Sequence, residues 1–164
     1  MLDNILITWF SHSGNTHEIA RQIHEITGGE TFEIITVNPY PEDYNSVVEI
    51  AKQELNSGKC PDLEIKPEDI DSYDTIFVGF PIWWGTMPMA VARFLSDCDL
   101  SGKTIIPFCT HGGGGASTSF ADLKKLCPNS TILKGLSLKG SNAKTAKPLV
   151  SAWLREIGAT RSGN

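Results

Sequence analysis

The stretch that decides the fold lies near the N-terminus and reads Ile5-Leu6-Ile7-Thr8-Trp9-Phe10-Ser11-His12-Ser13-Gly14-Asn15-Thr16. Residues 5–10 are almost continuously apolar, which is typical of a strand covered on both faces of a sheet. Residues 11–16 are polar, and the apolar positions beyond them, from Ile19 on, recur at helical spacing. The stretch therefore predicts a buried strand, a tight polar loop and a helix in direct succession.

The same alternation of apolar runs and helical patterns continues along the chain. Further strands are expected at residues 31–37, 75–80, 104–109 and 131–138. Helical patterns lie between them, and the last one, from Ala146 to Ile157, is closed by Gly158. This alternation predicts an α/β fold: a three-layer, doubly wound sheet of five parallel strands with helices on both faces.

Length and composition are those of one globular domain. The chain has 164 residues, 40% of them hydrophobic and 20% charged, and its net charge is −5. We expect a single domain over residues 1–164, with residues 160–164 as a loose tail. The negative charge argues against a nucleic-acid partner, and no apolar run approaches the ~20 residues of a membrane-spanning helix.

The cysteines and the N-terminus bear on the compartment. The four cysteines form no C-x-x-C pair, so neither a zinc site nor any other metal site is expected. No export signal is visible at the N-terminus. We therefore expect reduced thiols and a cytoplasmic protein.

Ligands of such sheets bind beyond the carboxyl ends of the strands, where the strand order reverses. The loops after the first, third and fourth expected strands are therefore the candidate site. The first, residues 11–16, brings hydroxyls, an amide and Gly14 to a helix N-terminus, where free N–H groups favour an anion such as phosphate. A helix cap without a ligand is the alternative. Neither a Walker A lysine nor a G-x-G-x-x-G fingerprint is present.

The other two loops add an aromatic wall and bare backbone. The third-strand loop reads Pro81-Ile82-Trp83-Trp84-Gly85-Thr86-Met87-Pro88, and its adjacent indole rings suit a flat heteroaromatic ligand. The fourth-strand loop reads Thr110-His111-Gly112-Gly113-Gly114-Gly115-Ala116-Ser117. Its four glycines permit close approach of the backbone to a ligand, or form a flexible connection. His111 could hydrogen-bond a ligand or simply face solvent.

Together these loops resemble those of flavodoxins, over nearly the whole chain. Residues 11–16 match the family's phosphate motif, (S/T)-x-(S/T)-G-x-(S/T), and the other two loops look like its flavin loops. The resemblance implies strand order 2-1-3-4-5, an uninterrupted fifth strand as in short-chain members, and FMN as a non-covalent cofactor. Residues 11–16 hold no lysine or arginine, so neutral dipoles would bind the phosphate.

The resemblance also implies the residues that contact FMN. Trp84 would stack on the flavin, with Trp83 packed beneath it. No catalytic residue is assigned. The full set of expected cofactor-binding residues is Ser11, His12, Ser13, Gly14, Asn15, Thr16, Pro81, Ile82, Trp83, Trp84, Gly85, Thr110, His111, Gly112, Gly113 and Ser117.

Two functions fit this resemblance. The first is an electron-transfer carrier between a reductase and an acceptor protein. The second is an NAD(P)H-dependent FMN oxidoreductase of quinone-type or related small acceptors, because the glycine-rich loop has no second aromatic ring to cover the flavin. A signalling receiver domain is excluded, since Phe10-Ser11 and Phe80-Pro81 stand where it needs acidic residues. The sequence specifies no oligomeric state.

Charge is unevenly distributed along the chain. Residues 1–102 hold 17 acidic and 5 basic residues, and residues 103–164 hold 2 acidic and 9 basic ones. A doubly wound sheet would turn this difference into an acidic side and a basic side. A carrier of this kind should bind its partner more weakly as salt rises.

Overall fold

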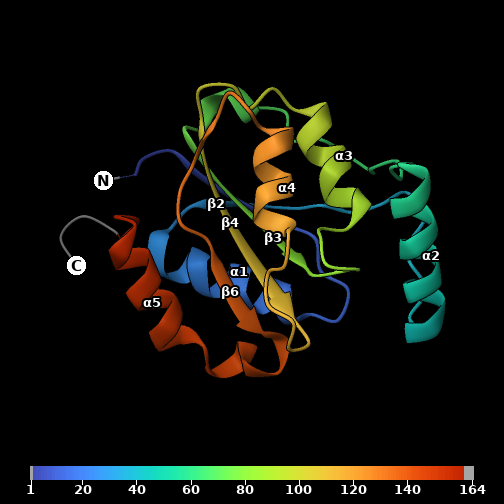
Figure 1. Cartoon of the computed structure of the whole chain (residues 1–164). Coiled ribbons are helices and arrows are strands. Elements are labelled where there is room, and N and C mark those ends of the chain that lie inside the picture. Colours follow the sequence, from blue (N-terminus) through green and yellow to red (C-terminus); the bar gives the residue numbers. More distant parts are fainter. Residues whose placement is uncertain (1, 161–164) are drawn as a thin grey trace.

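A parallel sheet forms the middle layer of the computed structural model, which describes residues 2–160 (Figure 1). Hydrogen bonding gives the order β2-β1-β3-β4-β5, with β6 also paired to β4, so the predicted order 2-1-3-4-5 is confirmed. The predicted tail lies outside the described residues except for Thr160. The strands are β1 Ile5–Trp9, β2 Glu30–Glu33, β3 Thr75–Pro81, β4 Thr104–His111, β5 Thr131–Ile132 and β6 Leu136–Lys139.

Helices cover both faces of the sheet. The α-helices are α1 Asn15–Thr27, α2 Tyr44–Ser57, α3 Met89–Asp97, α4 Ser119–Leu126 and α5 Lys147–Glu156, and the 3-10 helices are η1 Ile70–Ser72 and η2 Gly140–Thr145. The core on one face is formed with α1, η2 and α5, and the core on the other with α3 and α4 (Figure 1). The predicted three-layer fold is confirmed. Among the described residues, no helix has the length and apolar character needed to cross a membrane.

Side chains of β3 alternate between these two cores, which explains its unbroken apolar run. Ile76 and Val78 belong to the core under α3 and α4, whereas Phe77 belongs to the core under α1 and α5. Gly79 follows on the same face of the sheet as Phe77, and a Cβ there would lie 2.2 Å from the ring of Phe108. Glycine at this position is therefore what allows the β4 phenylalanine to lie across β3.

The fifth strand departs from expectation. The prediction of an uninterrupted strand over residues 131–138 is wrong, because the structure has two short strands there, β5 and β6. The carbonyl of Ile105 accepts the N–H of Leu133 at 3.1 Å. Backbone groups alternate sides along a strand, so Pro107, two residues after Ile105, also points its nitrogen towards the fifth strand. Because proline has no N–H, it cannot donate a hydrogen bond to that strand, and the pairing is interrupted there. A Cβ at Gly135 would lie 2.8 Å from the Pro107 carbonyl oxygen, so the position is also crowded.

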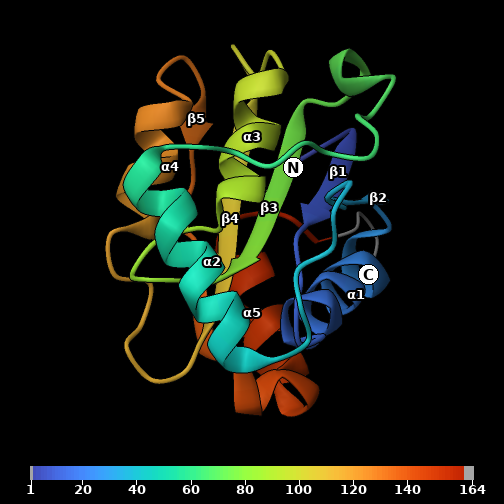
Figure 2. The same cartoon turned by 90° about the vertical axis from the view of Figure 1, so that its right-hand side faces the viewer.

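Peripheral elements are less buried than the rest. The second strand ends at Glu33 rather than extending to residue 37, and Thr36 instead forms an antiparallel bridge with Leu63. Helix α2 buries only Val47 and Ala51. Figures 1 and 2 show α2 standing away from the sheet, with its first turns at the end where the strands finish. This placement brings α2 to the candidate site.

Candidate functional site

Hydrogen bonds tie the carboxyl ends of β1, β3 and β4 together. The buried hydroxyls of Thr16 and Thr110 lie 2.9 Å apart and share a hydrogen bond. The N–H of Ile82 donates to the Thr110 carbonyl at 2.8 Å, and the N–H of Phe10 donates to the Gly79 carbonyl at 3.0 Å. The three predicted loops therefore start from fixed points on one edge of the sheet.

A cavity of about 570 Å³ opens at this edge, a size typical of small-molecule sites. Most of the expected cofactor-binding residues line it: His12, Ser13, Asn15, Pro81, Ile82, Trp83, Trp84, Thr110, His111 and Gly112. Within the described part of the chain, its lining contains no aspartate or glutamate. A wall without carboxylates favours a neutral or anionic ligand over a cationic one.

The first loop is shaped around the N-terminus of α1. Gly14 precedes the helix with φ 96°, in the left-handed region that glycine adopts without a Cβ clash. Its N–H donates to the Ser11 hydroxyl at 3.1 Å. The first N–H groups of a helix have no acceptor within it, and Ser13 and Asn15 line the cavity beside them. The loop therefore offers N–H, hydroxyl and amide donors to an anion.

Trp83 belongs to an aromatic cluster behind the cavity. Its ring centroid lies 5.0 Å from that of Tyr40, 5.4 Å from Phe10 and 6.0 Å from His12, each at a steep angle. The Tyr40 hydroxyl donates to Glu54 at 2.6 Å, and burial together with this carboxylate raises the pKa of Tyr40 above its usual value. Trp83 is therefore a half-buried wall held by its neighbours.

Trp84 is 49% exposed and reaches towards α2. Its indole N–H donates to the Val48 carbonyl at 2.9 Å, and the Lys52 ammonium lies 5.4 Å from the ring centroid. Its φ of 54° is left-handed, which is strained for a bulky residue. With Gly85, at φ 77°, it forms a two-residue turn closed by an antiparallel bridge between the residues on either side. Trp84 therefore presents the more accessible of the two indole rings.

The glycine-rich loop presents bare backbone at the edge of the cavity. His111 accepts the Gly113 N–H on Nδ1 at 3.0 Å, so its neutral ring carries the proton on Nε2. A Cβ on any residue of 112–115 would meet nothing within 4 Å. Gly113 and Gly115 nevertheless require glycine, because their φ angles are 141° and 75°.

Some expected residues lie outside the cavity lining and shape the loops instead. Hydroxyls of Ser11 and Thr16 are hydrogen-bonded within the protein. Ser117 packs against Gly85, with its Oγ 3.1 Å from the position a Cβ would take. Direct ligand contact by these residues stays a prediction. The set is Ser11, Gly14, Thr16, Gly85, Gly113 and Ser117.

Comparison with known protein families gives the same family that the three loops resemble. The family model described as "Flavodoxin" matches residues 4–157, which is nearly the whole described chain. The chain belongs to the flavodoxin family. No curated protein sequence matches it.

Solved structures similar to this flavodoxin-family chain include two from Bacteroides. A candidate flavoprotein from Bacteroides eggerthii is 32% identical, with TM-score 0.83, and the match covers 94% of this chain and 98% of that one. A second, from Bacteroides uniformis, is 30% identical over 92% and 99% of the two chains, with TM-score 0.77. A Lactobacillus acidophilus flavoprotein solved in complex with FMN shares the fold at 20% identity, covering 87% and 97%, with TM-score 0.74.

Two parts of this flavodoxin-family site were not expected from the sequence. Residues Val47, Val48 and Ala51 of α2 form an apolar wall next to Tyr44, and Lys139 and Ser141 lie at and just after the end of β6. The apolar spacing of α2 is the same as that of any core helix, so it carried no signal. Lys139 and Ser141 lie at the carboxyl end of the last strand, and the rule that selected the other loops applies to them equally.

Proposed function

We propose that this chain binds FMN non-covalently and acts as an electron-transfer carrier. The observation that carries the proposal is the two-ended cavity. Its apolar end is formed by the tryptophans and α2, and its polar end by the loop of residues 11–16 with residues at the ends of β4 and β6. A ligand with a flat aromatic ring at one end and a phosphate at the other matches both ends.

The residues present fit FMN on chemical grounds. Trp83 and Trp84 offer ring faces to a tricyclic ring system, and the lining has no carboxylate to repel a phosphate. Donors at the start of α1 supply the N–H groups that phosphate oxygens accept. When bound, FMN would supply the one- and two-electron redox chemistry.

The chain's own residues would orient the ring and control water and hydrogen bonds around it. Trp83 is fixed by its aromatic neighbours and keeps water from one side. Trp84, on its strained turn, would cover the ring from the α2 side. His111 lines the cavity with Nδ1 occupied by the Gly113 N–H, so its Nε2–H is the group left to donate a hydrogen bond to a ligand.

The carrier proposal includes a reductase and an acceptor protein as partners. The uneven charge along the sequence would orient them, so association should slow as salt rises.

The described thiols are all unpaired, which fits the reducing cytoplasm.

A second candidate is an NAD(P)H-dependent FMN oxidoreductase of quinone-type or related small acceptors. The observation in its favour is the extension of the cavity to α2, where Tyr44 is 78% exposed. With no phenylalanine, tyrosine or tryptophan on the glycine-rich loop, a second flat molecule would find space beside the flavin.

Two measurements test these functions in order. Titration of the apoprotein with FMN should quench flavin fluorescence and give a stoichiometric complex, and failure to load FMN would contradict both. The loaded protein is then mixed with NAD(P)H in a stopped-flow instrument. Bleaching of the flavin only after a separate reductase is added supports the carrier, and rapid direct bleaching supports the oxidoreductase.

A further inference from the structure

Lys139 lines the cavity, and its neighbour Gly140 lies against Asn15 of the loop of residues 11–16. Residues 11–16 contain no lysine or arginine. Among the residues that line the cavity in the described chain, Lys139 alone is a lysine or arginine. It ends β6, and its register partner on β4 is His111, which also lines the cavity. Neighbouring parallel strands therefore bring a lysine and a histidine to the same polar end.

Segment 139–141 lies against the start of α1. A Cβ at Gly140 would lie 2.6 Å from the Nδ2 atom of Asn15, so glycine is what lets the Asn15 amide pack on this backbone. Gln22 of α1 donates from Nε2 to the Ala143 carbonyl at 2.8 Å, which fixes η2 against α1. The chain beyond β6 is thus attached directly to the helix whose N-terminus carries the predicted phosphate site.

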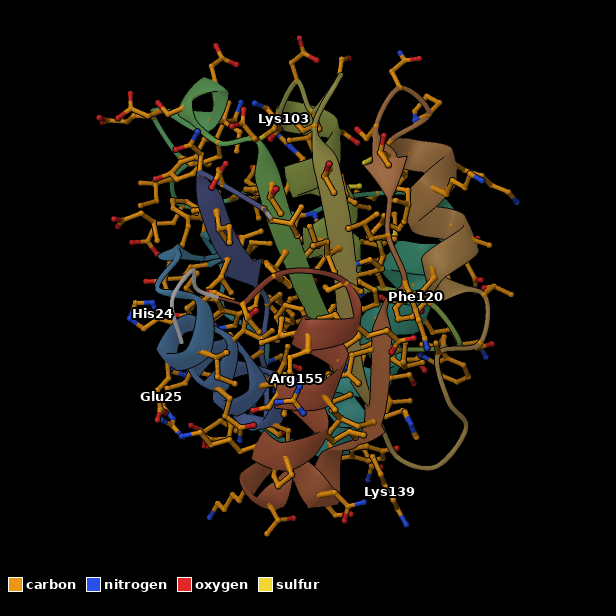
Figure 3. The ribbon with its side chains drawn as sticks, turned by 90° about the vertical axis from the view of Figure 1, so that its left-hand side faces the viewer. His24, Glu25, Lys103, Phe120, Lys139 and Arg155 are labelled. Carbon is orange, nitrogen blue, oxygen red and sulfur yellow. The ribbon has the colours of Figure 1, made fainter. Side chains whose placement is uncertain are left out.

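The ammonium group of Lys139 has no carboxylate partner among residues 2–160, and the same holds for Lys144, whereas Lys134 and Lys147 are paired. Lys134 pairs with Glu156 at 2.7 Å, and Lys147 pairs with Glu25. Lys139 is exposed, and Figure 3 shows its side chain extending beyond the end of β6. An unpaired ammonium on a flexible stem keeps its charge available to a ligand.

We propose that Lys139, together with the Ser141 hydroxyl, binds the phosphate group of the flavin nucleotide alongside the loop of residues 11–16. The inference rests on the proposed function, because it names the residues that would recognise the charge of the FMN phosphate at the same site. It replaces the expectation that neutral dipoles alone bind the phosphate. Lys139 would make the site prefer FMN to riboflavin, which has the same ring but no phosphate.

The test compares FMN with riboflavin on the apoprotein, by quenching of flavin fluorescence at low and at high salt. Lys139→Met removes the charge and keeps the stem. We expect its dissociation constant for FMN to rise about three- to tenfold, as for a partly exposed ion pair with a multiply charged group. The constant for riboflavin should stay within about twofold, and the salt dependence of FMN binding should shrink. Lys139→Arg should retain most of the preference for FMN.

Lys144→Met is the matched control. Lys144 lies on η2, is exposed and is absent from the cavity lining, so this variant changes the net charge equally. The inference is overturned if Lys139→Met weakens FMN and riboflavin equally, or if Lys144→Met has the same effect on FMN. Failure of the unmodified protein to bind either flavin would overturn the proposed function and the inference with it. Binding of both flavins with an unchanged preference in Lys139→Met overturns the inference alone.

Discussion

The backbone N–H of Thr118 donates to the carbonyl oxygen of Gly85 over 3.2 Å. This bond joins the start of α4 to the turn that carries Trp84. The Thr118 hydroxyl lies 3.2 Å from the same carbonyl and 2.8 Å from the Asp122 carboxylate, and its single proton serves one of them at a time. Thr86, directly after the turn, donates its hydroxyl to the same carboxylate at 2.6 Å. The strained turn is therefore held from α4 on both sides.

Thr118→Val should loosen this turn. The substitution removes the hydroxyl and keeps the backbone N–H and the shape of the side chain. Loss of a hydrogen bond to a carboxylate should lower the free energy of unfolding of the apoprotein by about 1–2 kcal/mol, measured in urea. Thr145→Val, which removes a hydroxyl from η2, is the control and should change stability less. Equal stability of Thr118→Val and the unmodified protein would contradict a role for the hydroxyl.

Substitutions of the two tryptophans should affect different properties, the stability of the fold for Trp83 and the binding of FMN for Trp84. Trp84→Ala removes a half-exposed ring and should weaken FMN binding by about 1–3 kcal/mol, with little change in the unfolding of the apoprotein. Trp83→Ala breaks the cluster with Phe10 and Tyr40 and should lower the free energy of unfolding by about 2–4 kcal/mol. Urea unfolding and fluorescence titration of both variants measure this difference. The reverse pattern would show that the roles of the rings are exchanged.

Trp84→Gly should be more stable in the apo form than Trp84→Ala. Position 84 has φ 54°, where an L-residue with a Cβ is strained by about 1–2 kcal/mol and glycine is not. Comparing the two small residues removes the effect of the lost ring. Thermal unfolding of the pair, without flavin, measures the strain. Alanine at least as stable as glycine would mean that the turn relaxes without cost.

Gly79→Ala should be among the most damaging single-methyl changes in the sheet. Its Cβ would lie 2.2 Å from the Phe108 ring, so the core between β3 and β4 must shift, at a cost of about 3 kcal/mol. Phe108→Leu in the same chain should recover part of that loss. Gly114→Ala, where a Cβ meets nothing within 4 Å, is the matched control. Urea unfolding of the variants tests the clash, and similar effects of the two alanines would contradict it.

Acid should weaken the start of α1. Hydrogen bonds from Arg21 lower the pKa of Glu18 from its usual 4.5 to about 2. A group whose folded pKa is lowered stabilises the protein above its unfolded pKa, and this contribution is lost as pH falls from about 4.5 towards 2. Solvent screening at the exposed Arg21 reduces its size. Unfolding in urea should therefore change less between pH 6 and pH 3 in Glu18→Gln than in the unmodified protein, and an equal change would contradict this role.

The sequence alone predicted the features of the fold and site that depend on short stretches of neighbouring residues. The apolar runs that end at Phe10 and Phe80 predict buried strands, and the loops directly after these runs predict the edge of the sheet where the cavity lies. The break in the fifth strand was not predictable in this way. It depends on the register that sets Pro107 opposite residues distant in sequence, and no local pattern encodes that register.

The same distinction applies within the site. Most loop residues were found because they come directly after strands. Val47 and Ala51 were missed because apolar residues on a helix look alike whether they face a core or a ligand. Lys139 was missed because the residues after the last strand were not included in the candidate site, although they follow the carboxyl end of a strand as the other loops do.

The path of the chain through β6 and η2 has a consequence for biosynthesis. When a ribosome has released the chain only as far as β4, the loop of residues 11–16 and the tryptophans exist, but the wall that begins at Lys139 does not. The cavity becomes complete only after η2 has emerged and docked on α1. The full set of lining residues is therefore present only once synthesis has passed the last strand, although the loop that starts α1 is among the first parts of the chain to be made.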